Sequence, residues 1–148
     1  MTARVQLALN VTDVDSAVDF YSKLLGTAPA KRRPGYANFA VEEPSLKLVL
    51  MQSDDAGGTL NHLGVEVGSP DEVGEAQTRL SARGLTTTAE SEVACCYANQ
   101  TKFWTADPDG APWEVYTVLS DAPHASLEAG DCDCGITQNE RGQAVGCC

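Results

Sequence analysis

Two stretches of sequence decide the fold: VQLALNVTDVD at residues 5–15 and NHLGVEVGSPDE at residues 61–72. Each begins with a segment that alternates apolar and other side chains, which is typical of a strand, and then reaches a helix start. In the first stretch, Thr12 can act as the N-cap of the helix. In the second, SPDE is a capping box with proline at the first helical position. We infer an internal repeat.

The pattern continues outward from both stretches. The first strand (5–11) leads to a helix that closes at Gly26, and the second strand (61–67) leads to a helix that closes at Gly84. An apolar stripe marks each helix: Val14, Ala17, Val18, Tyr21 and Leu25 in the first, and Val73, Ala76 and Leu80 in the second. Three strand-like segments follow each helix, at 27–33, 36–42 and 46–52, and at 86–94, 100–106 and 112–119. The chain therefore reads as two βαβββ modules, about 4–52 and 61–119, of the α+β class.

Composition narrows the function classes. The chain has 148 residues, 43% of them hydrophobic, and a formal net charge of −11. That length predicts one globular domain, at residues 1–119, and the acidic charge disfavours nucleic-acid and membrane partners. The N-terminus lacks the pattern of a signal peptide, so we expect a cytoplasmic protein. Its six cysteines are then expected to be ligands or reactive groups rather than disulfides.

Residues 120–148 differ from the rest. They carry five acids, one arginine and four cysteines, and they show neither helical nor strand periodicity. We expect a flexible, cysteine-containing tail. Its cysteines, Cys132, Cys134, Cys147 and Cys148, have two interpretations, inert thiols or metalloid ligands, and we favour the second.

Strand alternation points to one group of polar side chains. On the strand faces opposite the apolar stripes it places Gln6, His62 and Glu114. An imidazole, a carboxylate and an amide oxygen could together hold a divalent metal and leave positions open. The more common interpretation of a single strand histidine is a hydrogen-bonded or surface residue, so the pattern alone is a weak signal.

The duplicated modules, His62 and the segment DPDGAPWEV (107–115) resemble the vicinal oxygen chelate superfamily over residues 4–119. That superfamily includes glyoxalase I, extradiol dioxygenases and fosfomycin-resistance proteins. The resemblance implies that the modules form a half-open mixed β-barrel around a metal held by the first and last strands of each module. Gln6, His62 and Glu114 match three of these four positions.

Two departures from the family pattern matter. Gln6 stands where histidine is common, and the fourth position should lie in 46–52, which has neither histidine nor carboxylate. The missing fourth ligand argues against a glyoxalase. It fits a three-ligand site for non-haem Fe(II) and dioxygen better.

The segment EVACCYANQ (92–100) contains an adjacent thiol pair, Cys95 and Cys96. A disulfide between neighbours would be strained, and buried or incidental cysteines are the plainer alternative. In an extended strand the two thiols would point to opposite faces, whereas in a turn they could converge on one soft partner such as trivalent arsenic. An arsenical site therefore requires residues 95–96 to leave the strand, on the Glu114 side of the cavity.

The thiol pair, the three-donor site and the cysteine-bearing tail together resemble the carbon–arsenic lyases of this superfamily. The resemblance implies that Cys95 and Cys96 bind a trivalent methyl or aryl arsenical. It also implies that Gln6, His62 and Glu114 hold Fe(II), for which nickel, cobalt or manganese could substitute. With dioxygen as co-substrate, the carbon–arsenic bond would be cleaved and arsenite released.

Four neighbouring residues have less specific roles. Tyr116 could act in catalysis beside Glu114 by orienting dioxygen, or could simply line the cavity. Tyr97 and Trp104 could form an apolar wall for the organic group, although Trp104 is better explained by core packing. Lys102 could steer an anionic aryl substituent, although an exposed strand lysine is the better explanation.

Two other functions remain open. A metalloid-binding resistance protein would use the thiols without turnover, and an extradiol-type ring-cleaving dioxygenase would use the metal site but not the thiols. The duplication also leaves open whether the modules pair within one chain or across a homodimer.

Overall fold

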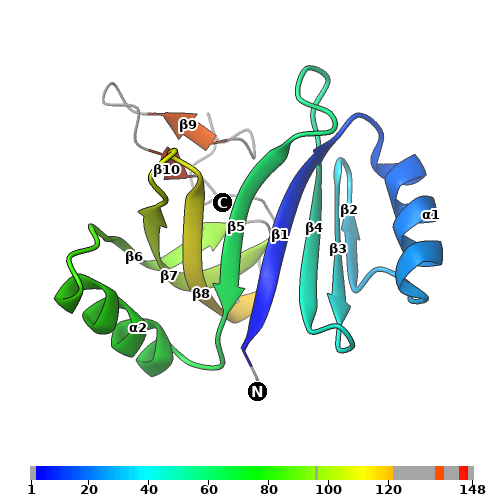
Figure 1. The fold of residues 1–148 in the computed structure, drawn as a ribbon. Coiled ribbons are helices and arrows are strands. Elements are labelled where there is room, and N and C mark those ends of the chain that lie inside the picture. Colours follow the sequence, from blue (N-terminus) through cyan, green and yellow to red (C-terminus); the bar gives the residue numbers. More distant parts are fainter. Residues whose placement is uncertain (1–2, 96, 122–135, 139–143, 147–148) are drawn as a thin grey trace. The chain divides into compact units, whose positions relative to one another are not determined.

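The computed structural model describes residues 3–95, 97–121, 136–138 and 144–146 (Figure 1). Two compact units contain these residues. One runs from Arg4 to Leu63 and is called the N-terminal unit; the other begins at Gly64, includes residues 1–3 and is called the C-terminal unit. The boundary between the two units falls inside the strand Leu60–Glu66.

The N-terminal unit is a mixed sheet with one helix. Its elements are β1 (Arg4–Val11), α1 (Val14–Leu25), β2 (Lys31–Arg33), β3 (Tyr36–Val41), β4 (Leu46–Gln52) and the first part of β5 (Leu60–Glu66). The strand order is β2-β3-β4-β1. β4 pairs with β3 antiparallel and with β1 in parallel, because α1 carries the chain back to the start of the sheet.

The start of α1 corrects one sequence prediction. The N-cap is Asp13, not Thr12: its side chain accepts the backbone N–H of Asp15 at 3.0 Å and the hydroxyl of Ser16 at 2.9 Å. Two adjacent residues of capping type precede the helix, and the one with two carboxylate oxygens can satisfy two donors at once. The helix ends at Gly26, whose φ of 67° is the left-handed conformation that glycine adopts without strain.

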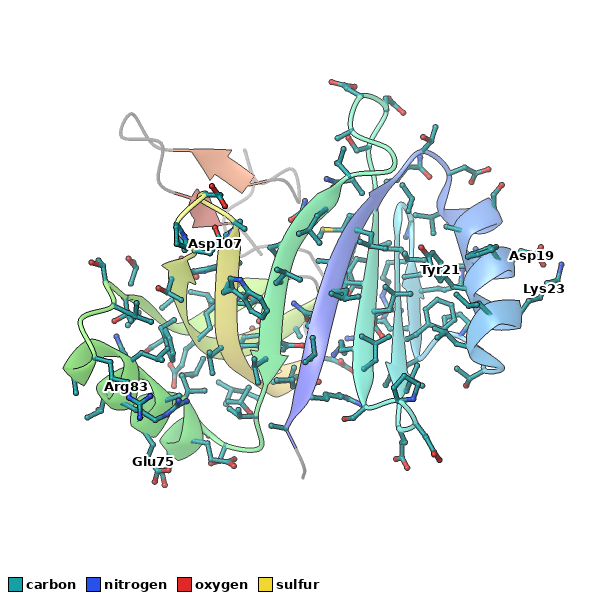
Figure 2. All side chains as sticks on the ribbon, viewed as in Figure 1. Asp19, Tyr21, Lys23, Glu75, Arg83 and Asp107 are labelled. Carbon is teal, nitrogen blue, oxygen red and sulfur yellow. The ribbon has the colours of Figure 1, made fainter. Side chains whose placement is uncertain are left out.

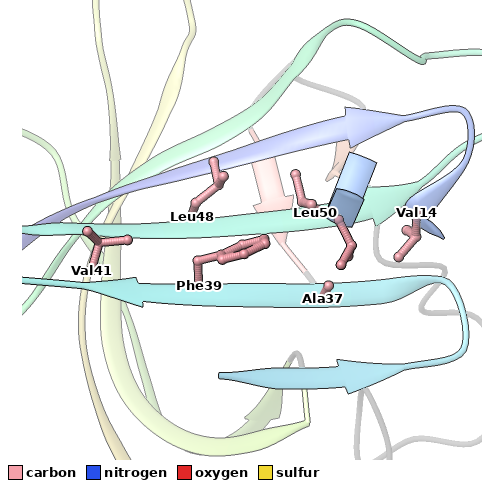
Figure 3. Packing of buried hydrophobic residues seen from close by; sticks show 7 residues of the cluster. Val14, Ala37, Phe39, Val41, Leu48 and Leu50 are labelled. Atoms are coloured by element: carbon pink, nitrogen blue, oxygen red, sulfur yellow. The ribbon is translucent and has the colours of Figure 1, made fainter. Parts of the chain in front are cut away.

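One face of α1 covers the sheet. Val14 and Val18 pack with side chains of β3 and β4, among them Phe39, Leu48 and Leu50 (Figure 3). The predicted stripe residues Ala17, Tyr21 and Leu25 lie against the same cluster. Tyr21 faces the sheet, while Asp19 and Lys23 lie on the outer side of the helix, where they form an ion pair at 2.8 Å (Figure 2). The hydrophobic effect on this one face therefore holds α1 in place.

The C-terminal unit repeats the plan of a strand, a helix and three strands. It contains the end of β5, α2 (Pro70–Ala82), β6 (Thr88–Cys95), β7 (Ala98–Ala106) and β8 (Pro112–Asp121). The strand order is β5-β8-β7-β6, in which β7 pairs antiparallel with both β8 and β6. Ser69 caps α2 and Pro70 occupies its first turn, as the capping box predicts. Val73, Ala76 and Leu80 pack against Phe103 and Val115. The chain thus has the α+β fold of two βαβββ modules, whose closure into a half-open barrel around a metal stays a prediction.

The structure extends beyond the expected end of the domain. β8 continues to Asp121, and two short strands, β9 (Ile136–Gln138) and β10 (Ala144–Gly146), pair antiparallel. No strand was predicted after residue 119, because three-residue strands are too short to show an alternating pattern. The tail cysteines lie outside the described residues. Neither helix in the described part of the chain combines the length and hydropathy needed to cross a membrane.

Candidate metal and substrate site

Gln6 of β1 and His62 of β5 meet inside the N-terminal unit. Nε2 of Gln6 lies 3.1 Å from Nε2 of His62. Only 4% of Gln6 and 1% of His62 is exposed, so the contact is shielded from solvent. Strand alternation correctly predicts that both side chains lie on the face away from α1, where Ala8 is also buried.

The other ring nitrogen of His62 has its own partner. Nδ1 lies 2.7 Å from Oδ1 of Asn61, which can only accept a hydrogen bond. Nδ1 therefore carries the proton in the neutral ring, and Nε2 presents its lone pair to the amide of Gln6. This is the arrangement in which a histidine can ligate a metal through Nε2, with the opposite N–H held by a hydrogen-bond acceptor.

The pair fits two positions of a divalent metal site. Ligand atoms about 2.0–2.1 Å from a metal and at right angles to each other lie about 3 Å apart, close to the separation of the Gln6 and His62 atoms. A half-turn of the Gln6 amide would present its oxygen, the donor of choice, at the same place. Among the described residues, no group of three or more His, Cys, Asp or Glu side chains is placed to hold a metal. A metal bound beside His62 would therefore need the amide of Gln6 as a ligand.

Glu114 of β8, the third predicted ligand, lies in the C-terminal unit. Its Oε2 accepts a hydrogen bond from Nζ of Lys102 at 2.8 Å, and the two side chains are 4% and 0% exposed. The alternative of an exposed strand lysine is therefore wrong, because β7 and β8 pair in a register that turns Lys102 toward Glu114. A charge so deeply buried requires an opposite charge, and each side chain supplies it for the other.

Aromatic side chains surround this ion pair. Nζ of Lys102 lies 5.3 Å from the ring centroid of Trp104, within the range of a cation–π contact. Tyr116, directly across from Lys102 in the β7–β8 register, is 1% exposed. Trp104 is buried opposite Glu114 in the β7–β8 register, and its indole donates a 3.4 Å hydrogen bond to Glu90. Lys102 thus combines a full charge with an apolar setting, and a metal that bound Glu114 would compete with its ammonium group.

Of the two cysteines predicted to bind arsenic, the structure describes the backbone of Cys95. Cys95 is the last residue of β6, and its Cα pairs with Ala98 of β7, so the expectation that it leaves the strand is wrong. The reason is the tightness of the hairpin, which keeps strand pairing up to Cys95. Cys96 lies outside the described residues. Tyr97, the next residue, has a φ of 62°, which shows a sharp turn at this point. Whether the two sulfurs converge stays a prediction.

Sequence reasoning missed Asn61, the hydrogen-bond partner of His62. Strict alternation places neighbours on opposite faces of a strand, and so it separates Asn61 from His62. Asn61 lies at the start of β5, where its side chain also donates to Oδ1 of Asn10 at 2.9 Å. The sequence signal for this contact is the presence of Asn10 near the end of one strand and of Asn61 beside His62 near the start of another.

The chain shares sequence with several named proteins over most of its length. It is 51% identical over 150 residues to a trivalent organoarsenical cleaving enzyme of Thermomonospora curvata, which covers 99% of both chains. It is 36% identical over 156 residues to an enzyme of the same name from Bacillus sp. (strain MD1), covering 96% of both. It is also 56% identical over 120 residues to the cadmium-induced protein CadI of Mycobacterium tuberculosis, which covers 81% of this chain and 79% of that protein.

Solved structures share the fold. A Mn(II)-bound glyoxalase from Novosphingobium aromaticivorans matches with a TM-score of 0.58 at 19% identity, over 91% of this chain and 46% of that one. An extradiol ring-cleaving dioxygenase from B. fuscum matches with a TM-score of 0.56 at 21% identity, over 80% and 32%. A family model described as the Glyoxalase/Bleomycin resistance protein/Dioxygenase superfamily matches residues 4–115. The chain belongs to this superfamily, known also as the vicinal oxygen chelate superfamily.

Proposed function

We propose that the protein is an enzyme that cleaves the carbon–arsenic bond of trivalent organoarsenicals and releases arsenite. The observation that carries this proposal is the 51% identity, over 99% of both chains, with a protein named for that activity. The contact between His62 and Gln6 supports it from the side of the structure, because both side chains can serve as metal donors. We expect the organic group to be methyl or aromatic.

The proposed centre contains Fe(II), held by Gln6, His62 and Glu114. Fe(II) at this place would supply dioxygen activation, because a site with only three protein ligands leaves coordination positions open. Lys102 would lose its contact with Glu114 when the carboxylate turns to the metal, and its positive charge would then be available to an anionic group of the substrate. Tyr116 would remain beside both.

Cys95 and Cys96 are proposed to hold the substrate as thiolates. Trivalent arsenic that carries one organic group needs two further ligands, and sulfur is the soft donor it prefers. Tyr97 follows the pair and is proposed to contact the organic group. The turn at Tyr97 could move the bound arsenical toward the metal, which would make motion of the hairpin part of turnover.

The overall reaction balances when a thiol reductant takes part. The carbon–arsenic bond breaks, one oxygen atom of dioxygen ends on carbon as a hydroxyl group, and the other ends on arsenic to complete arsenous acid. Two thiols supply two electrons and two protons and become a disulfide. We therefore expect arsenite and a hydroxylated organic product in equal amounts.

A second candidate is a metalloid-binding protein without turnover. The observation that favours it is the Lys102–Glu114 ion pair, which occupies the only carboxylate among the three proposed metal ligands. The same fold and thiols would then sequester the arsenical. A ring-cleaving dioxygenase is a third function, for which the structural neighbours provide fold similarity alone.

The test compares two adjacent cysteine pairs in the same chain. Fe(II)-loaded protein is mixed in air with a trivalent aryl or methyl arsenical and a thiol reductant, and arsenic species are separated over time. Replacing Cys95 and Cys96 by serine should abolish both arsenical binding and arsenite release. The same replacement of Cys147 and Cys148 should leave release intact. Binding without release in the wild type would favour sequestration, and catechol cleavage without arsenical binding would favour the dioxygenase.

A further inference from the structure

A chain of hydrogen bonds leads from His62 to the surface of the N-terminal unit. Oδ1 of Asn61 meets Nδ1 of His62 at 2.7 Å, and Nδ2 of Asn61 donates to Oδ1 of Asn10 at 2.9 Å. Nδ2 of Asn10 donates to Oγ1 of Thr59 at 3.0 Å. The hydroxyl of Thr59 donates to the carbonyl oxygen of Ala56 at 2.5 Å. Four side chains and one backbone carbonyl thus form a continuous series.

The last member fixes the direction of the whole series. A carbonyl oxygen can only accept, so Thr59 must use its single hydroxyl proton toward Ala56. The oxygen of Thr59 is then an acceptor, and Asn10 must direct its NH₂ group to it. Asn10 in turn offers its oxygen to the NH₂ group of Asn61. Asn61 is left with only an oxygen for His62, so Nδ1 must carry the proton.

We propose that Asn61, Asn10 and Thr59 are positioning residues that hold His62 in the Nδ1–H tautomer and direct the lone pair of Nε2 toward Gln6. The inference deepens the proposed function, on which its relevance to metal binding rests. It assigns the orientation of the histidine to a surface loop, residues 53–59, rather than to the ring's burial alone. The tautomer itself is a property of the metal-free protein and can be measured without any activity.

The loop that provides the fixed end is anchored by its backbone. Gly58 donates its N–H to the carbonyl of Asn10, and Asn10 donates its N–H to the carbonyl of Thr59, both at 2.9 Å. The N–H of Ser53 is bonded to the carbonyl of Val11 at 2.8 Å. A Cβ atom at Gly57 would collide with Thr12, which shows how closely the loop lies on the end of β1. Removing the Thr59 hydroxyl should therefore leave the loop in place.

The chain offers a matched pair of threonines for the test. Thr59 is exposed and Thr105 is half-buried, and the hydroxyl of each donates to a backbone carbonyl, that of Thr105 to Thr86 at 3.0 Å. The chain has two histidines, so a His124→Gln background leaves His62 as the only imidazole. Proton–nitrogen correlation spectra of its ring then report which nitrogen carries the proton. Binding of Ni(II), measured by calorimetry, reports the consequence for a metal.

Wild-type protein should show the Nδ1–H tautomer. Thr59→Val should give a mixture of tautomers and weaker Ni(II) binding, whereas Thr59→Ser, which restores the hydroxyl, and Thr105→Val should match the wild type. Asn61→Ala should lose the Nδ1–H form and weaken Ni(II) binding by about 10- to 100-fold, the usual effect of removing the partner of a metal-ligating histidine. If Asn61→Ala destabilises the fold, Thr59→Val and Thr59→Ser still decide the question.

The outcomes separate this inference from the proposed function. An Nε2–H tautomer in the wild type, or a tautomer that does not respond to Asn61→Ala and Thr59→Val, would overturn the inference, even if arsenite is released. Tautomer changes and weaker Ni(II) binding in a protein that never releases arsenite would support the inference and sink the proposed function. A wild type that binds no divalent metal would overturn the proposed function alone, because the tautomer is measured on the metal-free protein.

Discussion

The two units bury polar side chains by different physical means. In the N-terminal unit, Gln6 and His62 belong to a network of neutral groups, whose arrangement is set by the direction of successive hydrogen bonds. In the C-terminal unit, Lys102 and Glu114 are full charges that compensate each other across 2.8 Å. Removing one exposed member of a neutral network should change the free energy of unfolding little, whereas removing either partner of a buried ion pair should lower it strongly. The duplicated modules should therefore respond differently to substitution.

The largest effect is expected at the ion pair. Lys102→Met removes the ammonium group that donates to the buried carboxylate of Glu114 and should lower the free energy of unfolding by about 3–5 kcal/mol. Adding Glu114→Gln removes that charge as well, so the double variant should recover most of the loss. Urea denaturation of the wild type, both single variants and the double variant measures the coupling. Additive losses would show that the two charges do not depend on each other.

A smaller loss of stability is expected when the packing of either helix against its sheet is weakened. Val18 of α1 and Val73 of α2 are both buried against their own sheets. Replacing either by alanine removes two methyl groups and leaves a small cavity, and should lower the free energy of unfolding by roughly 2 kcal/mol. The same denaturation measurement applies. A loss at Val73 less than half of that at Val18 would show that α2 is the less firmly docked helix.

Two glycines should respond with opposite signs. Gly26 ends α1 with a φ of 67°, so Gly26→Ala should destabilise the protein by about 1 kcal/mol. Gly74 lies inside α2, and a Cβ there would meet nothing within 4 Å. Gly74→Ala should therefore stabilise by about 0.5–1 kcal/mol. Thermal unfolding of the two variants provides the measurement, and a shift of the same sign for both would contradict the structure.

The smallest effect on stability is expected from the pH dependence of the helix N-caps, Asp13 in α1 and Ser69 in α2. The hydroxyl of Ser16 and the backbone N–H of Asp15 hold the pKa of Asp13 below its ordinary value of 3.8. The cap of α1 is thus fully effective at neutral pH, and its contribution falls as acid lowers the pH from about that ordinary value through the folded-state pKa. Ser69, the cap of α2, does not titrate in this range.

Carbon NMR of the Asp13 carboxyl group measures its pKa directly. Asp13→Ser replaces a titrating cap by the type found in α2, and should remove this part of the acid sensitivity. Ser69→Ala should weaken α2 without removing the acid sensitivity that Asp13 gives to α1. An Asp13 pKa at or above 3.8 would contradict the cap geometry.

Local patterns predicted much of the fold. The stripe of α1 and the capping box of α2 are local features with strong preferences, and both appear as expected. The choice between Thr12 and Asp13 could not be predicted, because both can cap a helix and the difference lies in which donors are within reach. β9 and β10 could not be predicted either, since three residues are too few for a pattern.

The site was predictable only where alternation decides it. Alternation places Gln6 and His62 on the buried face, and both are there. The burial of Lys102 depends on the register of β7 against β8, which is a pairing between distant residues and cannot be read from a single strand. Asn61 was missed because its contact with His62 departs from strict alternation at a strand end. The less local a contact is, the less the sequence alone reveals it.

The central claim is that this chain cleaves carbon–arsenic bonds. The most direct measurement is the amount of arsenite that Fe(II)-loaded wild-type protein forms from a trivalent aryl arsenical in the presence of a thiol reductant. It is made twice, once in air and once under anaerobic conditions. The account predicts arsenite in air, with one hydroxylated organic product for each arsenite, and none without oxygen. Recovery of the intact arsenical from the protein after incubation in air would contradict it.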